Sequence, residues 1–259
     1  MSLLLATSVA AMIAFAAVNR GALTRGGGLA AWAVGTAVLA GGSWAGGSAL
    51  IVFFLTSTIV TRATEHRFPR VIDRRGTTRD ASQVLANGGA ALAGGLVALV
   101  APGPGLWIIA CSLAVATADT WATGFGALSR VDPVDFAHWR RVAPGTSGGV
   151  SLPGTVGGAI GAAAIAGTLV LAGHTSLGLA CLPVGIGGML TDSLLGATLQ
   201  ARYRCAACGL EGEEPAHCPG AAAVLEGGVR WVNNDGVNAI ATTAGGLAGL
   251  VLWHCCSPS

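Results

Sequence analysis

The sequence predicts an all-α fold: a polytopic bundle of about eight transmembrane helices with its polar loops on the cytoplasmic face. Hydrophobic residues make up 53% of the 259-residue chain and charged residues only 10%, with a mean hydropathy of +0.67. Soluble domains carry about 25% charged residues, so most of this surface cannot face water. We interpret residues 1–259 as one integral membrane domain that includes a small cytoplasmic, cysteine-containing loop at 201–234.

The apolar segments recur at the length of a membrane span, because a hydrocarbon core of about 30 Å needs roughly 20 apolar residues per helix. Residues 1–18 lack the basic region of a signal peptide and are interpreted as the first span. The uncharged stretch 29–61 is too long for one span, and four glycines between residues 41 and 47 provide a turn inside it. The predicted spans are residues 2–19, 29–42, 46–62, 84–101, 105–126, 154–173, 177–200 and 236–254.

The positions of the arginines agree with this topology. All 14 basic residues are arginine, and in an eight-span arrangement every one of them falls on the same side. The positive-inside rule makes that side cytoplasmic and places both termini outside, in the cell (inner) membrane. Because the arginines are spread between spans, they do not indicate nucleic-acid binding. Membrane lipids are the expected surroundings, and a homo-oligomer is compatible with the sequence.

Three acidic residues, Asp119, Asp192 and Asp235, lie in or beside apolar segments. A carboxylate inside the membrane costs about 2.5–3.5 kcal/mol, so each indicates a function or a buried partner. In the predicted topology all three lie at a similar depth near the cytoplasmic face. Oxygen ligands at one depth suit Mg²⁺, which keeps waters that a phosphate can replace. We therefore predict these three as catalytic, metal-binding residues; the alternative is that each is capped by neighbouring groups for helix packing.

The segment from Pro144 to Gly149 is the predicted phosphate-binding loop. Its glycines let successive backbone N–H groups point into one concavity, and two hydroxyls add donors. It is not a Walker A loop, because the chain contains no lysine. A tight turn before the sixth span is the alternative. The predicted phosphate ligands in and before this loop are Arg141, Gly145, Thr146, Ser147, Gly148 and Gly149.

Further polar residues stand where spans begin or beside the aspartates. Asn233, Asn234 and Asp235, with Asn238 one turn on, exceed what one helix cap requires, so we predict ligand contacts there and metal contact for Asn234. A second set enters the fourth span at roughly helical spacing, as interfacial anchors or as another wall of the same site. The remaining predicted substrate ligands are Arg79, Gln83, Asn87, Thr120 and Ser193.

Cys205-x-x-Cys208, followed by His217 and Cys218, has the spacing of the first half of a zinc knuckle. In a reducing cytoplasm these thiols do not form a stable disulfide. Adjacent His and Cys residues rarely both bind one tetrahedral ion, so the second half is poorly formed. Structural Zn²⁺ and unpaired thiols in a loop both remain open.

Five segments resemble the transmembrane protein 19 family, in the same order over nearly the whole chain: Arg79–Gly88 (RDASQVLANG), Ala118–Ser129 (ADTWATGFGALS), Val142–Ser151 (VAPGTSGGVS), Asp192–Gln200 (DSLLGATLQ) and Trp231–Asn238 (WVNNDGVN). That family includes the plant phytyl-phosphate kinase of tocopherol synthesis. Where this sequence has Gly124, the family usually carries a glutamate.

The resemblance implies transfer of a phosphoryl group from a nucleoside triphosphate, CTP or ATP, to a membrane-embedded prenyl monophosphate. The expected cofactor is Mg²⁺, and the expected partner is an isoprenoid phosphate lipid. Such a transfer depends on positioning and charge neutralisation, which fits aspartates, arginines and backbone donors at one face. The alternative is a transporter or flippase for a lipid phosphate or another anion, with the similar segments around Asp119 and Asp192 as paired half-helix sites.

Overall fold

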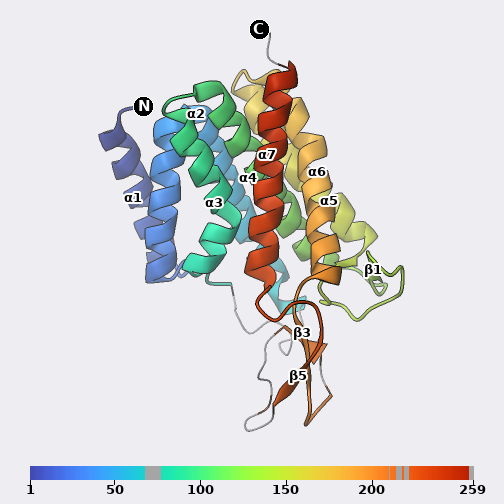
Figure 1. The fold of residues 1–259 in the computed structure, drawn as a ribbon. Helices are drawn as coiled ribbons and strands as arrows, with labels where there is room; N and C mark the ends of the chain where they lie inside the picture. Colours follow the sequence, from blue (N-terminus) through green and yellow to red (C-terminus); the bar gives the residue numbers. More distant parts are fainter. Residues whose placement is uncertain (68–76, 210, 214–217, 219–221, 257–259) are drawn as a thin grey trace.

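The computed structural model describes residues 1–67, 77–209, 211–213, 218 and 222–256, and these form a helical bundle with short strands at one end (Figure 1). The described part is mostly helical, as predicted. Its α-helices are α1 (Leu3–Asn19), α2 (Arg25–Thr64), α3 (Ala81–Ala98), α4 (Pro102–Gly126), α5 (Leu152–Leu171), α6 (Thr175–Thr198) and α7 (Asn234–Cys256), and a 3-10 turn, η1 (Glu65–Arg67), follows α2.

Five helices of the described chain are long and apolar enough to cross a membrane. A sixth, α1, is apolar but shorter. Their outer faces carry exposed large hydrophobic side chains, which suit contact with lipid. The predicted class, a polytopic membrane bundle, is therefore confirmed, and the number of eight spans stays a prediction. The five candidate spans are Arg25–Arg67, Pro102–Gly126, Leu152–Leu171, Thr175–Thr198 and Asn234–Cys256.

The long helix α2 reverses direction in its middle. Ser43 is non-helical, with φ 54° and ψ −155°. A straight helix of 40 residues would extend about 60 Å, yet Arg62, near its end, donates a hydrogen bond of 3.0 Å to the backbone oxygen of Arg20, just before its start. The second half packs on the first through Gly47, where a Cβ atom would lie 2.4 Å from Leu39. The break falls between the predicted spans 29–42 and 46–62.

Helix α4 occupies the centre of the bundle. It contacts α2, α3, α5, α6 and α7, and from Ile109 to Ala118 its side chains are almost completely buried. The surrounding helices approach it through small residues: a Cβ atom on Gly249 of α7 would lie 2.6 Å from the backbone oxygen of Trp107. Such close contacts are the usual means of association between membrane helices. The position of α4 brings the Asp119 segment to the meeting point of several helix ends.

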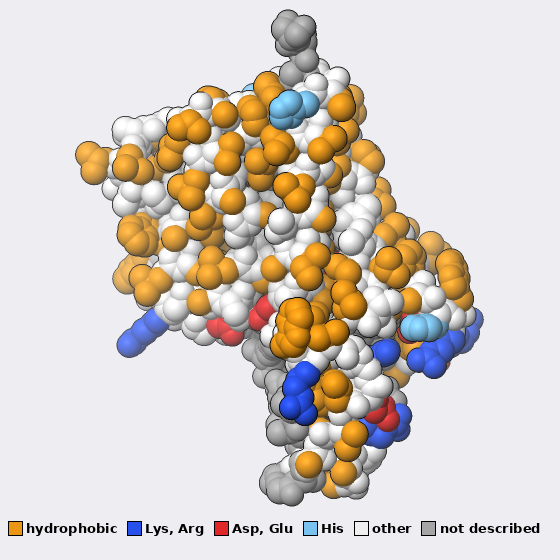
Figure 2. All heavy atoms as spheres, viewed as in Figure 1, with side chains coloured by type: hydrophobic (Ala, Val, Ile, Leu, Met, Phe, Trp, Pro, Cys, Tyr) orange, Lys and Arg blue, Asp and Glu red, His pale blue; other side chains and the backbone are white. Residues whose placement is uncertain are grey.

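Short strands and the charged residues gather at one end of the bundle, which we call the polar end. There β1 (Val134–Asp135) pairs antiparallel with β2 (Gly149–Val150) in the connection between α4 and α5. A second sheet, between α6 and α7, has the order β4-β3-β5, from β3 (Arg202–Cys205), β4 (Glu211–Gly212) and β5 (Ala223–Gly227). Figure 2 shows the visible arginine and acidic side chains at this end and an apolar surface along the helices. The predicted gathering of polar residues on one face agrees with this view.

The close contact between α3 and α2 gives a matched pair of substitutions. A Cβ atom on Gly95 would lie 2.5 Å from backbone atoms of Ala37, whereas a Cβ on Gly89, also in α3, would meet nothing within 4 Å. We expect Gly95→Ala to destabilise the bundle by about 1–3 kcal/mol, because the backbone of Ala37 in α2 would have to shift to make room for the added methyl group. Gly89→Ala should be neutral or slightly stabilising. Thermal unfolding in detergent, followed by size-exclusion chromatography, measures both; equal stability of the two variants would contradict the packing described.

Candidate functional site

A cavity of about 800 Å³ opens at the polar end of the bundle. Its wall is built from the second half of α2 with η1, the start of α3, the end of α4, the connection between α4 and α5, the end of α6 and the start of α7. Segments far apart in the sequence therefore supply one polar concavity beneath an apolar bundle. Cavities into which several polar groups converge are common ligand-binding sites in proteins.

Nearly all the residues predicted for substrate, phosphate or magnesium line this cavity. The three aspartates are among them, as are residues from α3, α7 and the glycine-rich loop. Arg141 and Asn233 are not on the wall. The predicted residues that line the cavity are Arg79, Gln83, Asn87, Asp119, Thr120, Gly145, Thr146, Ser147, Gly148, Gly149, Asp192, Ser193, Asn234, Asp235 and Asn238.

The carboxyl groups of Asp119 on α4 and Asp192 on α6 interact with each other. One oxygen of Asp192, Oδ2, is buried and has no hydrogen-bond partner among the described residues. Two carboxylates about 4 Å apart repel by roughly 4 kcal/mol at an effective dielectric constant of 20. The pair therefore requires a shared proton or a cation. Its oxygen-only donor set, with one oxygen unsatisfied, suits a hard divalent ion.

Arg79 projects a positive charge into the same cavity from a backbone that is held on both sides. Its N–H donates to the oxygen of Ala22 at 3.0 Å, and its own oxygen accepts from Thr24 N–H at 3.0 Å. The guanidinium lies 5.8 Å from the ring centroid of Phe53. Loss of hydration by burial lowers the pKa of Arg79 to about 10, so it remains charged at neutral pH. A partly dehydrated guanidinium is a strong ligand for phosphate.

The starts of α3 and α7 meet at Ser82. Its hydroxyl lies 2.7 Å from Oδ2 of Asp235 and 2.8 Å from Oδ1 of Asp80. Asn233 caps α7, since its Oδ1 accepts from Gly236 N–H at 2.9 Å. The predicted Asn and Asp ligands therefore have two different roles. Asn233 is the N-cap of α7, and its presence is explained by ordinary capping. Asn234, Asp235 and Asn238 line the cavity.

The glycine-rich loop packs against the end of α6. Gly145 and Gly148 have positive φ values of 87° and 77°. A Cβ atom on Gly148 would lie 2.5 Å from Ala197, so both conformation and space require glycine there. Ser147 donates a 2.5 Å hydrogen bond to Oε1 of Glu213. The capping of α5 belongs to Ser151, whose Oγ accepts from Gly154 N–H, and the loop itself is left on the cavity wall.

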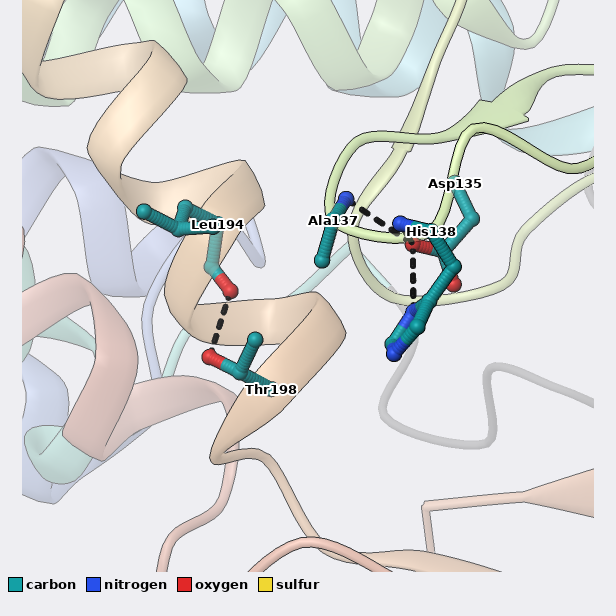
Figure 3. A network of polar contacts seen from close by, with 5 residues as sticks. All are labelled: Asp135, Ala137, His138, Leu194 and Thr198. Carbon is teal, nitrogen blue, oxygen red and sulfur yellow. Dashed lines mark hydrogen bonds and ion pairs between the residues drawn. The ribbon is translucent and has the colours of Figure 1, made fainter.

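A buried carboxylate organises the connection that carries this loop (Figure 3). Oδ1 of Asp135 accepts from the backbone N–H groups of Ala137 and His138, both at 2.9 Å, and lies 3.0 Å from Nδ1 of His138. Although burial alone raises the pKa of Asp135, these contacts with His138 and Ala137 lower it overall. Phe136 then donates its N–H to the oxygen of Gly148 at 3.0 Å. Asp135 therefore holds the turn that positions the loop.

The sequence reasoning missed several residues of the wall. Arg62, η1 and the glutamate Glu213 were not predicted, because nothing in their spacing connects them to the aspartates. The contact of Glu213 with Ser147 and its electrostatic interaction with Asp192 show that it belongs to the site. Charged or hydrogen-bonding residues added by the structure include Arg62, Glu65, His66, Arg67, Gln200 and Glu213.

The predicted zinc ligands lie away from this wall. Sulfur atoms of Cys205, Cys208 and Cys218 lie within 4.8 Å of one another at the end of the β3–β5 sheet. His217, also predicted as a ligand, lies outside the described residues.

Arg141, predicted as a phosphate ligand, is exposed and donates to the backbone oxygen of Asp132 at 3.1 Å.

An apolar bundle with a polar cavity at its end defines an integral membrane protein with a ligand-sized site at one face. The chain belongs to the integral membrane protein family DUF92, which matches residues 8–246. It is 28% identical to Protein PGR of Arabidopsis thaliana over 269 residues, covering 91% of each chain. It is 30% identical to the uncharacterized membrane protein MJ0933 of Methanocaldococcus jannaschii over 207 residues, 79% of this chain and 74% of the relative. No solved structure matches significantly.

The role of Asp135 gives a test of the loop. Asp135→Asn removes a charged acceptor, and hydrogen bonds to charged groups contribute about 1.5–3 kcal/mol. We expect faster amide hydrogen exchange in residues 134–150, with Asp132→Asn, an exposed aspartate off the wall, as the control. Folding lowers the pKa of Asp135. Ionised Asp135 therefore stabilises the fold at pH values above its pKa in the unfolded chain, about 3.9. This stabilisation is lost as the pH falls through the lower pKa of the folded protein. Unchanged exchange in Asp135→Asn would contradict this role.

Proposed function

We propose that this protein is a prenyl-monophosphate kinase. It transfers a phosphoryl group from a nucleoside triphosphate, CTP or ATP, to a membrane-embedded isoprenoid monophosphate of the phytyl or geranylgeranyl type. The observation that carries the proposal is one cavity whose wall combines a carboxylate pair, a partly dehydrated arginine and a glycine-rich loop. Its position at the end of an apolar bundle suits a substrate with a lipid tail and a phosphate head.

The proposed topology has eight membrane crossings, because α2 reverses at Ser43 and counts twice. The positive-inside rule then places the polar end in the cytoplasm and both termini on the opposite, external side of the inner membrane. In this orientation the cavity faces the cytoplasmic supply of nucleotide. The isoprenoid tail lies in the bilayer, and the protein makes no nucleic-acid contact; it acts as a single chain or as a homo-oligomer.

Magnesium fits the carboxylate pair. Asp119 and Asp192 supply oxygen ligands in contact, one oxygen of Asp192 is buried without a partner among the described residues, and Mg²⁺ favours one or two carboxylates together with phosphate oxygens. Asn234 and Asp235 bring further oxygens to the same wall from α7. When bound, the ion neutralises phosphate charge and holds the two substrates together.

The chain's own residues position and stabilise the phosphates. Arg79 and the glycine-rich loop hold phosphate oxygens, and Gln83, Asn87 and Asn238 add amide groups to the wall. A phosphate oxygen of the prenyl substrate attacks the γ-phosphorus, a new P–O bond forms, the bond to the β-phosphate bridging oxygen breaks, and the nucleoside diphosphate leaves. A phosphate oxygen is already ionised at neutral pH, so no strong general base is needed.

Gly124 lines the cavity where the resemblance to the transmembrane protein 19 family implies a glutamate. A Cβ atom there would lie 2.4 Å from a side-chain methyl group of Val60, so a larger side chain requires the Val60 side chain to move. In the proposal, Glu213 supplies the additional carboxylate, since it interacts electrostatically with Asp192. The additional carboxylate then comes from the residue that follows β4 and not from position 124 of α4.

The proposal is tested with purified protein, Mg²⁺, CTP or ATP, and farnesyl, geranylgeranyl or phytyl monophosphate, with the prenyl diphosphate measured by mass spectrometry. We expect product with at least one pair. Asp119→Asn and Asp192→Asn should each lower turnover by about 10²-fold or more, because charge stabilisation dominates such transfers. Asp132→Asn, at the same end of the molecule but off the wall, should keep wild-type turnover.

Absence of product with every substrate, together with movement of a lipid phosphate across vesicle membranes, would overturn the kinase in favour of the transporter. Full turnover in Asp119→Asn or Asp192→Asn would remove that residue from the catalytic site.

Arg79 gives a second prediction. Arg79→Gln should raise the KM for the phosphate substrates by roughly 10–100-fold, because it removes charge-assisted hydrogen bonds of about 1.5–3 kcal/mol. Arg79→Lys should restore part of the loss by keeping the charge. Arg130→Gln, an exposed arginine off the wall, serves as the control. Initial rates against substrate concentration measure the effect, and an unchanged KM in Arg79→Gln would contradict phosphate binding by this side chain.

A further inference from the structure

Three cysteines at the end of the β3–β5 sheet form a cluster that the proposed function does not use. The sulfur atoms of Cys205, Cys208 and Cys218 lie within 4.8 Å of one another. Sulfur ligands of one tetrahedral Zn²⁺ are about 3.8 Å apart, because each Zn–S bond is about 2.3 Å. The three sulfurs are thus already close to the spacing that a shared ion requires. The cluster lies far along the chain from Cys255 and Cys256, which are exposed at the end of α7.

Backbone donors surround the first sulfur of this cluster. Cys205 ends β3, and the backbone N–H groups of Ala207, Cys208 and Cys218 interact favourably with its sulfur. The chain turns tightly after it, since Gly209 N–H donates to the oxygen of Cys205 at 2.9 Å and Gly209 has a φ of 72°. Such N–H groups directed at sulfur stabilise thiolates and orient them as ligands, as the outer contacts of metal sites do.

We propose that Cys205, Cys208 and Cys218 bind a structural Zn²⁺ that holds Glu213 against the glycine-rich loop. Three thiolates select a soft or borderline ion such as Zn²⁺ and not Mg²⁺. The C-x-x-C pair has the usual spacing of zinc ligands, and the third cysteine follows ten residues later. Among the described residues these three sulfurs are the protein ligands that meet.

The position of Glu213 connects this metal to the cavity. Glu213 stands five residues after Cys208 and five before Cys218, directly after β4, where Gly212 pairs with Tyr203 of β3. Its carboxylate accepts the 2.5 Å hydrogen bond from Ser147 of the glycine-rich loop. β4 has only two residues, and a two-residue strand provides little stability by itself. The ion fixes the chain on both sides of Glu213 and so fixes the contact with Ser147.

Metal analysis of the purified full chain tests the site. Protein purified without a chelator should contain about one zinc per chain. Cys205→Ser, Cys208→Ser and Cys218→Ser should each lose most of it, whereas Cys255→Ser/Cys256→Ser should keep it. The zinc content does not depend on kinase activity, so its outcome is independent of the proposed function.

A zinc-free wild-type protein, or variants that keep full zinc content, would overturn the metal site. A disulfide between two of the three cysteines in freshly purified protein, found by mass spectrometry under non-reducing conditions, would also overturn it. If a serine variant fails to fold, chelator-treated wild-type protein titrated with Co²⁺ gives a second measurement. Thiolate-to-cobalt charge-transfer absorption is expected, and its absence would count against the site.

The coupling to the cavity has its own readout. Removal of zinc should speed amide hydrogen exchange in residues 145–149, and Glu213→Gln should do the same while keeping its zinc. The Cys255→Ser/Cys256→Ser control should show no change in either quantity. Unchanged exchange in residues 145–149 of the zinc-free protein would overturn the coupling even if zinc is present.

Discussion

The close packing of four helices against the backbone of α4 is the constraint on which the rest of the structure depends. Inside a membrane no hydrophobic force draws helices together, so their association depends on complementary shape and on small residues that let the backbones approach closely. Each of these four helices places a glycine where a Cβ atom would lie about 2.6–3.1 Å from an α4 backbone atom: Gly94 of α3, Gly161 of α5, Gly185 of α6 and Gly249 of α7. Because these contacts fix α4 in rotation and depth, they also fix where Asp119 points.

Asp119 lies beside Asp192 because α4 and α6 are held close. The electrostatic repulsion between the two carboxylates determines which ligands the site can accept. The buried acid outside the helices shows the contrast. Oδ1 of Asp135 accepts from two backbone N–H groups and lies beside His138 within its own turn, so its role is structural, although its Oδ2, like that of Asp192, is buried without a partner among the described residues. Asp119 and Asp192 differ from Asp135 because each faces the other carboxylate and not a set of N–H donors, and two facing carboxylates suit a cation from outside.

The bundle class and most of the cavity wall could be predicted from the sequence, since apolar length, glycine turns and intramembrane charge depend on local composition. The predicted break near Ser43 coincides with the observed reversal, because four glycines within seven residues weaken a helix at that point. Two predicted ligands are elsewhere. Asn233 caps α7 and Arg141 reaches Asp132, since short-range backbone partners compete with a distant ligand for the same side chain.

By itself the sequence determined that this is a membrane bundle with its charged residues at one end, because the cost of charge in lipid depends only on residue type and position along a span. Tertiary structure decided which polar groups share a cavity. Glu213 reaches Ser147 across 66 positions of chain, and Cys218, whose pairing with the C-x-x-C motif the sequence left open, joins Cys205 and Cys208. Contacts of this kind depend on how loops fold over helix ends, which neither hydrophobic periodicity nor charge placement encodes.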